Sequence, residues 1–254
     1  LEEKELLVVA KILLESRAFT KKEMSQVLDK LIAGCVPAKN MKLVSDLLAN
    51  EKFHYVEVSH PAGLQEKLWD IGEDIQLRHL MKISYTRQGG KSTPVTRIVE
   101  PVAILFSEYY FYLNAYIVVL QNDRRYIHKY DYPAIFRIDR IDAYELMEER
   151  FTLPYANRFQ EGEFRKRVQF MYAGSLERIR FRYTGKSVDA ILDRLPTAKI
   201  LSQDERSFVI EAEVFGKGIV MWLLSQGERV EVLGPEHIRT EMHDTISHML
   251  ELYR

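Results

Sequence analysis

The sequence predicts an α+β protein, and three observations support that prediction. Apolar residues recur at helical spacing from Leu1 to about His79. The period then changes from 3.6 to 2, which is typical of short antiparallel strands, between Lys82 and Leu146. From Glu177 onward the pattern gives the order β-α-β-β-α-β, which is that of a ferredoxin-like sandwich with one extra terminal helix. We therefore predict a helical N-terminal connector, a small β-barrel and a ferredoxin-like C-terminal domain.

Four helices are expected before the period changes. The first runs from Leu1 to about Ser16, and a short third helix lies around residues 41–48. Thr20-Lys-Lys-Glu23 has the pattern of a capping box, so a second helix begins there and ends near Gly34. The fourth helix is expected over 64–79, with these side chains facing inward: Leu68, Ile71, Ile75 and Leu77.

The middle of the chain favours a barrel over an open parallel sheet, because its short strands leave no helix for crossover connections. The expected strands cover residues 82–86, 95–99, 102–105, 111–120 and 134–146, with a glycine turn at 88–91 and Pro101 between the second and third strands. Residues 153–158 break the pattern and are expected to be a connector. Beyond them we expect strands at 177–184, 198–202, 207–215 and 229–233, and helices at 187–195, 218–226 and 235–253.

One expected strand has a row of phenols along one face. Successive side chains of a strand point to opposite faces, so the even positions 110–116 lie together on the face away from the core side chains. These even positions are Tyr110, Tyr112, Asn114 and Tyr116. The row is either the exposed side of a half-buried antiparallel strand or a wall that faces a ligand, since Tyr offers both a stacking surface and a hydroxyl.

Composition narrows the classes of function. The chain has 254 residues, enough for about two domains, and a formal net charge of -1, which gives no overall attraction to nucleic acid or to an anionic membrane. Its single cysteine, Cys35, lies in an apolar helical context and fits a reducing compartment, so we expect a cytoplasmic protein. No apolar stretch reaches the roughly 20 residues of a membrane helix.

Several motifs then point to a family. The runs that carry the resemblance are Thr96–Pro101, Tyr110–Ala115, Phe136–Ile141, Val220–Gly227 and Val230–Pro235. In the second run, Tyr110-Phe111-Tyr112-Leu113 resembles a Trp-Tyr-Leu signature with Phe111 in the place of tryptophan. In this order the runs resemble the WYL-domain transcriptional regulators of the DeoR-like helix-turn-helix class, and the last two resemble the C-terminal WCX extension of these regulators.

The resemblance implies an organisation for the chain. It implies a helical connector and dimerisation region over 1–63, a WYL domain with an Sm/SH3-like barrel over 64–152, and the C-terminal extension over 153–254. These regulators carry an N-terminal winged helix-turn-helix, but nothing between Leu1 and Asn50 offers a recognition helix with clustered basic residues. We therefore expect a fragment that begins after that DNA-binding domain, forms a homodimer, and reaches double-stranded DNA only through the missing part.

The resemblance also implies that the barrel senses a nucleotide or single-stranded nucleic acid. Carried over residue by residue, the expected effector contacts are Arg97, Tyr112, Arg137 and Arg140. Guanidinium groups bind phosphate in bidentate fashion and tyrosine rings stack on bases. Ala134 stands where many members have another arginine, so one phosphate contact is lost or the ligand differs. Alternatively, Arg137 and Asp139 share a strand face as a local ion pair, whereas Arg140 lies on the opposite face.

A second basic feature lies in the C-terminal region. Arg178, Arg180 and Arg182 alternate along one strand, so they share a face and repel one another unless anions or carboxylates compensate them. The stripe is either a solvated outer sheet face or a set of phosphate contacts.

Catalytic motifs are not found in the sequence. His243 and His248 fall on different faces of a helix, and Asp70, Glu73 and Asp74 are typical of solvent-facing helical charge. We expect no enzyme activity, no catalytic or metal-binding residue and no cofactor. The alternative to an effector sensor is a structural or protein-interaction module that uses the phenol face for assembly.

Overall fold

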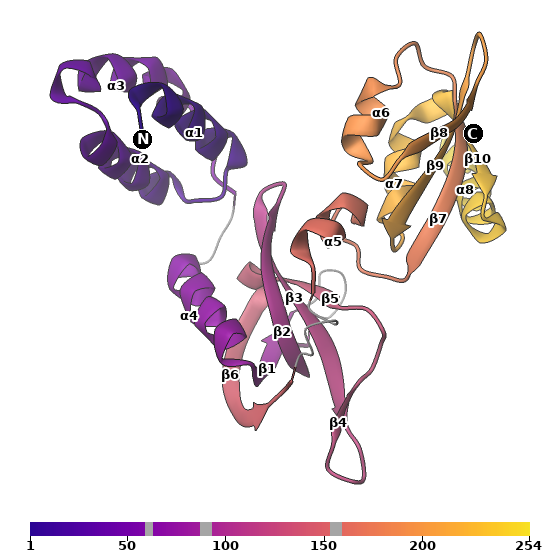
Figure 1. Ribbon diagram of the computed structural model, residues 1–254, viewed down its shortest axis with the longest axis horizontal. Helices are drawn as coiled ribbons and strands as arrows, with labels where there is room; N and C mark the ends of the chain where they lie inside the picture. The colour runs from indigo at the N-terminus through magenta and orange to yellow at the C-terminus, as the bar shows by residue number, and fades with distance from the viewer. Residues whose placement is uncertain (59–62, 87–92, 153–158) are drawn as a thin grey trace.

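The computed structural model describes residues 1–58, 63–86, 93–152 and 159–254, which form three groups of elements (Figure 1). The helices are α1 (Glu3–Ser16), α2 (Lys21–Cys35), α3 (Ala38–Phe53), α4 (Leu64–Leu77), α5 (Glu161–Arg167), α6 (Asp189–Arg194), α7 (Gly218–Ser225) and α8 (Glu236–Glu251), with 3-10 helices η1 (Ile138–Arg140) and η3 (Gly227–Arg229). The strands are β1 (His79–Tyr85), β2 (Val95–Ser107), β3 (Tyr110–Leu120), β4 (Tyr126–His128), β5 (Ala134–Arg137), β6 (Ile141–Arg150), β7 (Leu176–Tyr183), β8 (Lys199–Gln203), β9 (Phe208–Phe215) and β10 (Val230–Gly234).

The first three helices form a bundle around their own core. The side chains of Leu6, Met24, Leu28 and Leu48 are almost fully buried there. The predicted capping box is confirmed, since the Thr20 backbone N–H donates to Glu23 and the Glu23 backbone N–H donates back to the Thr20 hydroxyl. Helix α3 has 16 residues and is longer than the short helix expected from its apolar spacing. None of the helices in the described chain is long and apolar enough to span a bilayer.

The first sheet is antiparallel and follows α4. Its strand order is β4-β3-β2-β1-β6, and β5 pairs with β3 beside β4. Helix α4 covers one face, where Ile71 packs with Met81, Ile83 and Leu113. Within the described residues the pairings form an open path, so the closed small barrel is not confirmed.

Several expectations for this sheet are wrong in detail. The single strand over 134–146 is broken by η1, because the chain leaves the edge of β3 after Arg137 and then pairs with β1 as β6. The two strands on either side of Pro101 are one strand, β2, with an irregularity in register between Pro101 and Ala103. Leu77 was expected to face inward, but it is 50% exposed at the end of α4. The expected turn at 88–91 and the connector at 153–158 lie outside the described residues.

The second sheet has the order β10-β7-β9-β8 and is antiparallel throughout. Helices α6 and α7 lie between its strands in the chain, so the predicted β-α-β-β-α-β order is confirmed. One face of β7 buries Ile179, Phe181 and Tyr183 in a core that also holds Trp222 of α7. Pro235 precedes α8, as the sequence predicts.

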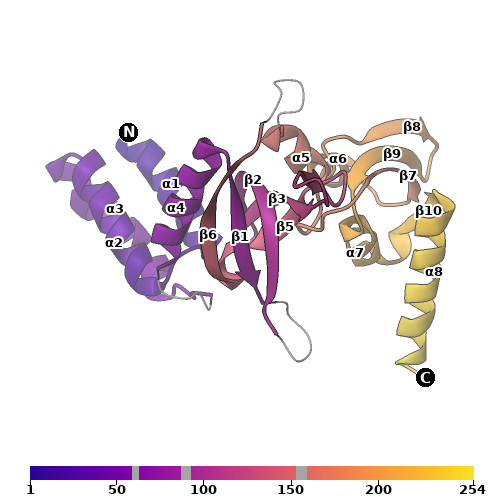
Figure 2. The same ribbon diagram turned by 90° about the horizontal axis from the view of Figure 1, so that it is seen from below.

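Helix α5 lies between the two sheets (Figures 1 and 2). Its buried Phe164 packs in a cluster with Leu105 of the first sheet and beside Phe215 of the second sheet. The Phe164 and Phe215 rings are stacked, with centroids 5.3 Å apart. This short helix therefore joins the two sheets through a small apolar core of its own.

Candidate functional site

The row of phenols lies on the face of β3 that the alternation predicts. Leu113 and Ala115 point into the core under α4, whereas Tyr112 packs on the other side of the sheet, toward α5. Burial raises the pKa of the Tyr112 hydroxyl, and the charge of Arg137 acts in the opposite direction. The middle of the row is thus covered by α5 rather than open to solvent.

Tyr112 and Arg137 come together as predicted, because they are directly opposite each other on β3 and β5. The Arg137 guanidinium lies over the Tyr110 ring, 3.4 Å from its centroid. The same guanidinium donates to both carboxylate oxygens of Asp139, with Nε–Oδ1 at 3.0 Å and Nη2–Oδ2 at 2.5 Å. Arg137 is therefore held in place and its charge is compensated by a carboxylate.

Arg97 is not brought to this group. It lies opposite Ile83 of β1, so it shares the face of the sheet that packs under α4, which is the reverse of the Tyr112 face. Its guanidinium donates to the carbonyl of the neighbouring Thr96 at 3.0 Å. Arg140 lies in η1, so the expectation that it occupies the opposite face of a continuous strand is wrong.

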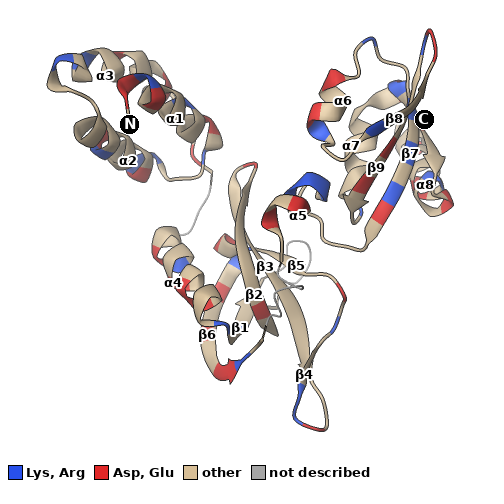
Figure 3. Ribbon diagram, viewed as in Figure 1, with Lys and Arg blue, Asp and Glu red and all other residues tan. Residues whose placement is uncertain are grey.

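The arginine stripe of β7 is paired with carboxylates of the neighbouring strands. Arg178 contacts Glu213 at 3.2 Å, Arg180 contacts Glu211 at 3.2 Å, and Arg182 forms an ion pair with Glu231 of β10. In Figure 3, the basic residues of β7 accordingly lie beside acidic residues of the neighbouring strands. The positive charge of the arginine stripe is therefore compensated by carboxylates of the protein itself.

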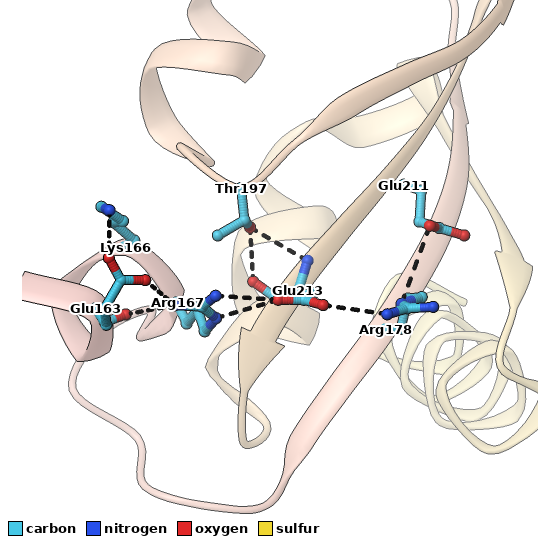
Figure 4. Close-up of polar contacts among 7 residues, drawn as sticks. All are labelled: Glu163, Lys166, Arg167, Arg178, Thr197, Glu211 and Glu213. Carbon is cyan, nitrogen blue, oxygen red and sulfur yellow. Dashed lines mark hydrogen bonds and ion pairs between the residues drawn. The ribbon is translucent and has the colours of Figure 1, made fainter. Parts of the chain in front are cut away.

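Figure 4 shows how α5 joins this charged face. Arg167 donates to Glu163 of its own helix at 2.7 Å and to Glu213 of β9 at 3.1 Å, and Lys166 donates to Glu163 at 2.5 Å. Arg167 and then Arg178 hold the pKa of the Glu213 carboxyl below its usual range. The backbone of Glu213 is fixed as well, because its carbonyl accepts from the Thr197 hydroxyl at 2.7 Å. A cavity of about 370 Å³ lies beside this cluster.

Two further cavities meet at Tyr116, the last phenol of the row. The first, of about 650 Å³, is lined by His128, Glu100 and Arg150. The Tyr116 ring stacks on His128 with centroids 4.4 Å apart, and His128 Nε2 lies 2.7 Å from a Glu100 carboxylate oxygen. The second, of about 380 Å³, lies between the sheets and is lined by Tyr116, Tyr132, Phe159, Phe164 and Phe215, together with Asp131, Gln160, Glu163 and Arg167.

Asn114 lies between Tyr112 and Tyr116 on the same face of β3. Its side chain is fully buried, and neither amide atom has a hydrogen-bond partner among the described residues. Buried polar atoms are almost always hydrogen-bonded, and each unmet group costs about 1–3 kcal/mol. An unsatisfied amide under the phenol face is thus a feature that the packing alone does not account for.

Sequence reasoning missed the cavities at Tyr116, although it placed Tyr116 in the row. The walls of these cavities depend on β4 and α5, two short elements that the spacing of apolar residues does not predict. The pairing of β4 with β3 places His128 opposite Val118, beside Tyr116. The available sequence signal was the aromatic content of residues 126–132 and 159–164.

Comparison with known protein families identifies two domains in this architecture. Residues 67–146 match the WYL domain family, and residues 175–250 match the WCX domain family. The chain carries a WYL domain followed by a WCX domain. The WYL domain comprises most of α4, β1 to β5 and most of β6, and the WCX domain comprises the second sheet with α6, α7 and most of α8. The resemblance seen in the motifs is confirmed for these two domains.

Relatives and solved structures are similar over different parts of the chain. The protein named uncharacterized HTH-type transcriptional regulator YobV, of Bacillus subtilis (strain 168), is 24% identical over 183 residues, which are 68% of this chain and 52% of that protein. The chain therefore spans about half the length of this curated relative. Proteasome accessory factor B/C of Arthrobacter aurescens is similar over 100% of this chain and 36% of its own, with 15% identity and a TM-score of 0.39. The crystal structure of a CRISPR Cas-related protein covers 75% of this chain and 52% of its own, with 17% identity and a TM-score of 0.47.

Proposed function

We propose that this chain is the effector-sensing and dimerising part of a bacterial transcriptional regulator. The WYL and WCX domains and the HTH-type regulator among the relatives support this role. In this proposal the WYL domain binds a nucleotide or single-stranded nucleic acid in the cytoplasm. A helix-turn-helix outside residues 1–254 binds double-stranded DNA, and the effector shifts the balance between two arrangements of a homodimer. We propose no enzymatic reaction and no cofactor for the chain.

The observation that carries the proposal is the Tyr110–Arg137–Asp139 arrangement beside Tyr112. The guanidinium is stacked on one ring and fixed by two hydrogen bonds, so it needs little ordering when a phosphate approaches. Because Asp139 already occupies two donors of Arg137, a phosphate must compete with this carboxylate. Because the contact of Arg137 with a phosphate is electrostatic, binding is expected to weaken as salt rises.

The same proposal extends to the folds of the domains. We interpret the antiparallel strands of the WYL domain, with their core under α4, as an Sm-like module. The WCX strand order β10-β7-β9-β8 fits a ferredoxin-like sandwich. We retain 1–63, 64–152 and 153–254 as the proposed domain ranges.

The test is titration of the purified chain with short single-stranded oligonucleotides and with cyclic dinucleotides. Arg137→Ala should weaken binding about tenfold, which corresponds to the loss of one charged hydrogen-bonding group. Arg206→Ala is the matched control, because it removes an exposed arginine in the turn between β8 and β9, outside both the phenol row and the arginine stripe. The proposal fails if no ligand of the panel binds, or if both variants weaken binding equally.

The second candidate is a structural or protein-interaction module. The pairing of Arg137 and of the arginine stripe with carboxylates favours it, because neither set then requires an external anion. Self-association that is lost in Tyr110→Ala, with no binding to the panel, would favour this reading over the sensor.

A further inference from the structure

The cavity between the two sheets has the walls of a small-molecule site. Its volume of about 380 Å³ is in the range of ligand pockets, which are mostly apolar with a few placed polar groups. The apolar part is a series of rings, in which Phe159 and Phe164 have centroids 5.1 Å apart and Phe164 stacks on Phe215. Flat aromatic walls of this kind favour a flat ligand, since rings stack in offset or edge-to-face arrangements.

The polar groups of this cavity stand at its edge. Asp131 has no ion-pair or hydrogen-bond partner for its side chain in the part of the chain that the structure describes, so its carboxylate is ready to accept from a ligand. Arg167 is fixed by Glu163 and Glu213 where this cavity adjoins the charged cluster of Figure 4. An acceptor and a held cation in the lining of one cavity suit a ring that donates hydrogen bonds and carries an anionic group.

The Tyr116 hydroxyl is a further polar group in the wall of this cavity. Burial, with the charges of Glu100 and Asp131, raises the pKa of the Tyr116 hydroxyl, so it remains a neutral donor at the wall of the cavity.

We propose that the cavity between the WYL and WCX domains binds the base of a nucleotide that has an exocyclic amino group. The base lies among Tyr116, Phe159 and Phe164, and its amino group donates to Asp131. Its phosphate lies toward Arg167, where it competes with the Glu163 carboxylate. This inference rests on the proposed sensing function and adds a site for a single nucleotide at the Tyr116 end of the row, while Arg137 beside Tyr112 remains the proposed phosphate contact for oligonucleotides. Since the walls come from both sheets and α5, an occupied cavity ties the two domains together.

The experiment compares AMP, CMP, GMP and UMP as probes by calorimetric titration of the full chain. UMP lacks the exocyclic amino group, so it should bind about tenfold more weakly than the other three. Asp131→Ala should remove this preference by weakening AMP, CMP and GMP while UMP stays unchanged. Phe159→Ala should weaken all four about fivefold or more through the loss of stacking.

Two controls keep the outcomes distinct. Asp123→Ala removes an exposed carboxylate that pairs with Arg125 outside the cavity between the sheets, and it should leave all four affinities unchanged. The melting temperature of each variant without ligand reports whether it is folded, and the exposed position of Asp131 makes a folded variant the expected result. The inference is overturned if Asp131→Ala and Asp123→Ala behave alike, or if UMP binds as well as the others.

The inference and the proposed function fail in different ways. Binding that is lost in Arg137→Ala but unchanged in Asp131→Ala and Phe159→Ala would place the ligand at Tyr110 and overturn only the inference. If neither the four mononucleotides nor the oligonucleotide panel binds, both are overturned. Binding of oligonucleotides alone, with no effect of Asp131→Ala or Phe159→Ala, also leaves the proposed function standing and rejects the cavity.

Discussion

At the scale of single residues, Asn114 has a buried side chain whose polar atoms are unsatisfied. Its amide is fully buried on β3, with no partner among the described residues for nitrogen or oxygen. Removing both polar atoms while filling the same volume therefore removes a desolvation cost without breaking a hydrogen bond.

We predict that Asn114→Leu raises the free energy of unfolding by about 1 kcal/mol or more. Urea denaturation of the chain without ligand measures it. Asn50→Leu, on the exposed side of α3, is the control and should change stability by less than about 0.5 kcal/mol. If Asn114→Leu is instead destabilised, ordered water satisfies the Asn114 amide in solution.

At the scale of elements, α5 is attached to β9 by charge as well as by packing. Arg167, followed by Lys166, holds the pKa of Glu163 below its usual value of 4.5, and Arg167 does the same for Glu213. A carboxyl whose folded-state pKa is depressed stabilises the fold above its unfolded pKa, and this stabilisation is lost as pH falls through the folded value. The attachment should therefore be present at pH 7 and absent in acid.

Glu213→Gln should lower the melting temperature at pH 7, and the difference from the wild type should shrink as pH falls below about 4.5. Thermal melts at a series of pH values measure this convergence. Glu205→Gln, in the polar turn between β8 and β9, removes the same charge from a residue for which no ion pair with a described residue is found, and its effect should be small. A difference between Glu213→Gln and the wild type that persists unchanged at pH 3 would contradict an electrostatic origin.

The elements that sequence predicted are those whose pattern is local. The capping box at Thr20 and the alternation of β3 depend on neighbouring residues only, so both could be predicted from sequence. Helix α5 has seven residues, five of them charged, and buries only Phe164, so its existence depends on the sheets that it joins. Strand β4 has three residues and exists through its pairing with β3.

The same reasoning explains the candidate site. Tyr112 and Arg137 were predicted together and meet across β3 and β5. Arg97 was predicted with them but lies on the reverse face, because the face of a β2 residue depends on its register with β1, which no local pattern specifies. The aromatic cavity could not be predicted, since its walls come from elements far apart in sequence.

At the scale of the whole molecule, the described contacts make α5 a mechanical link between the WYL and WCX domains. Phe164 is 5% exposed and contacts apolar residues of both sheets, so it contributes to the stability of each only while the other is folded. Loss of a buried phenyl ring costs about 3–5 kcal/mol. The loss falls on the junction rather than on either core, so it should reduce the cooperativity of unfolding more than the stability of each domain.

We predict that Phe164→Ala separates the unfolding of the two domains. Trp222 is buried against Phe181, so in a Trp69→Phe background, which removes the exposed tryptophan of α4, fluorescence reports on the WCX core, whereas far-ultraviolet circular dichroism reports on all elements. The two probes should give coincident urea transitions in the wild type and in Phe53→Ala, where the ring is 72% exposed, and different midpoints in Phe164→Ala. A single coincident transition at lower urea in Phe164→Ala would mean that contacts other than the α5 cluster couple the domains. An effector bound between the sheets would then have to act through those contacts.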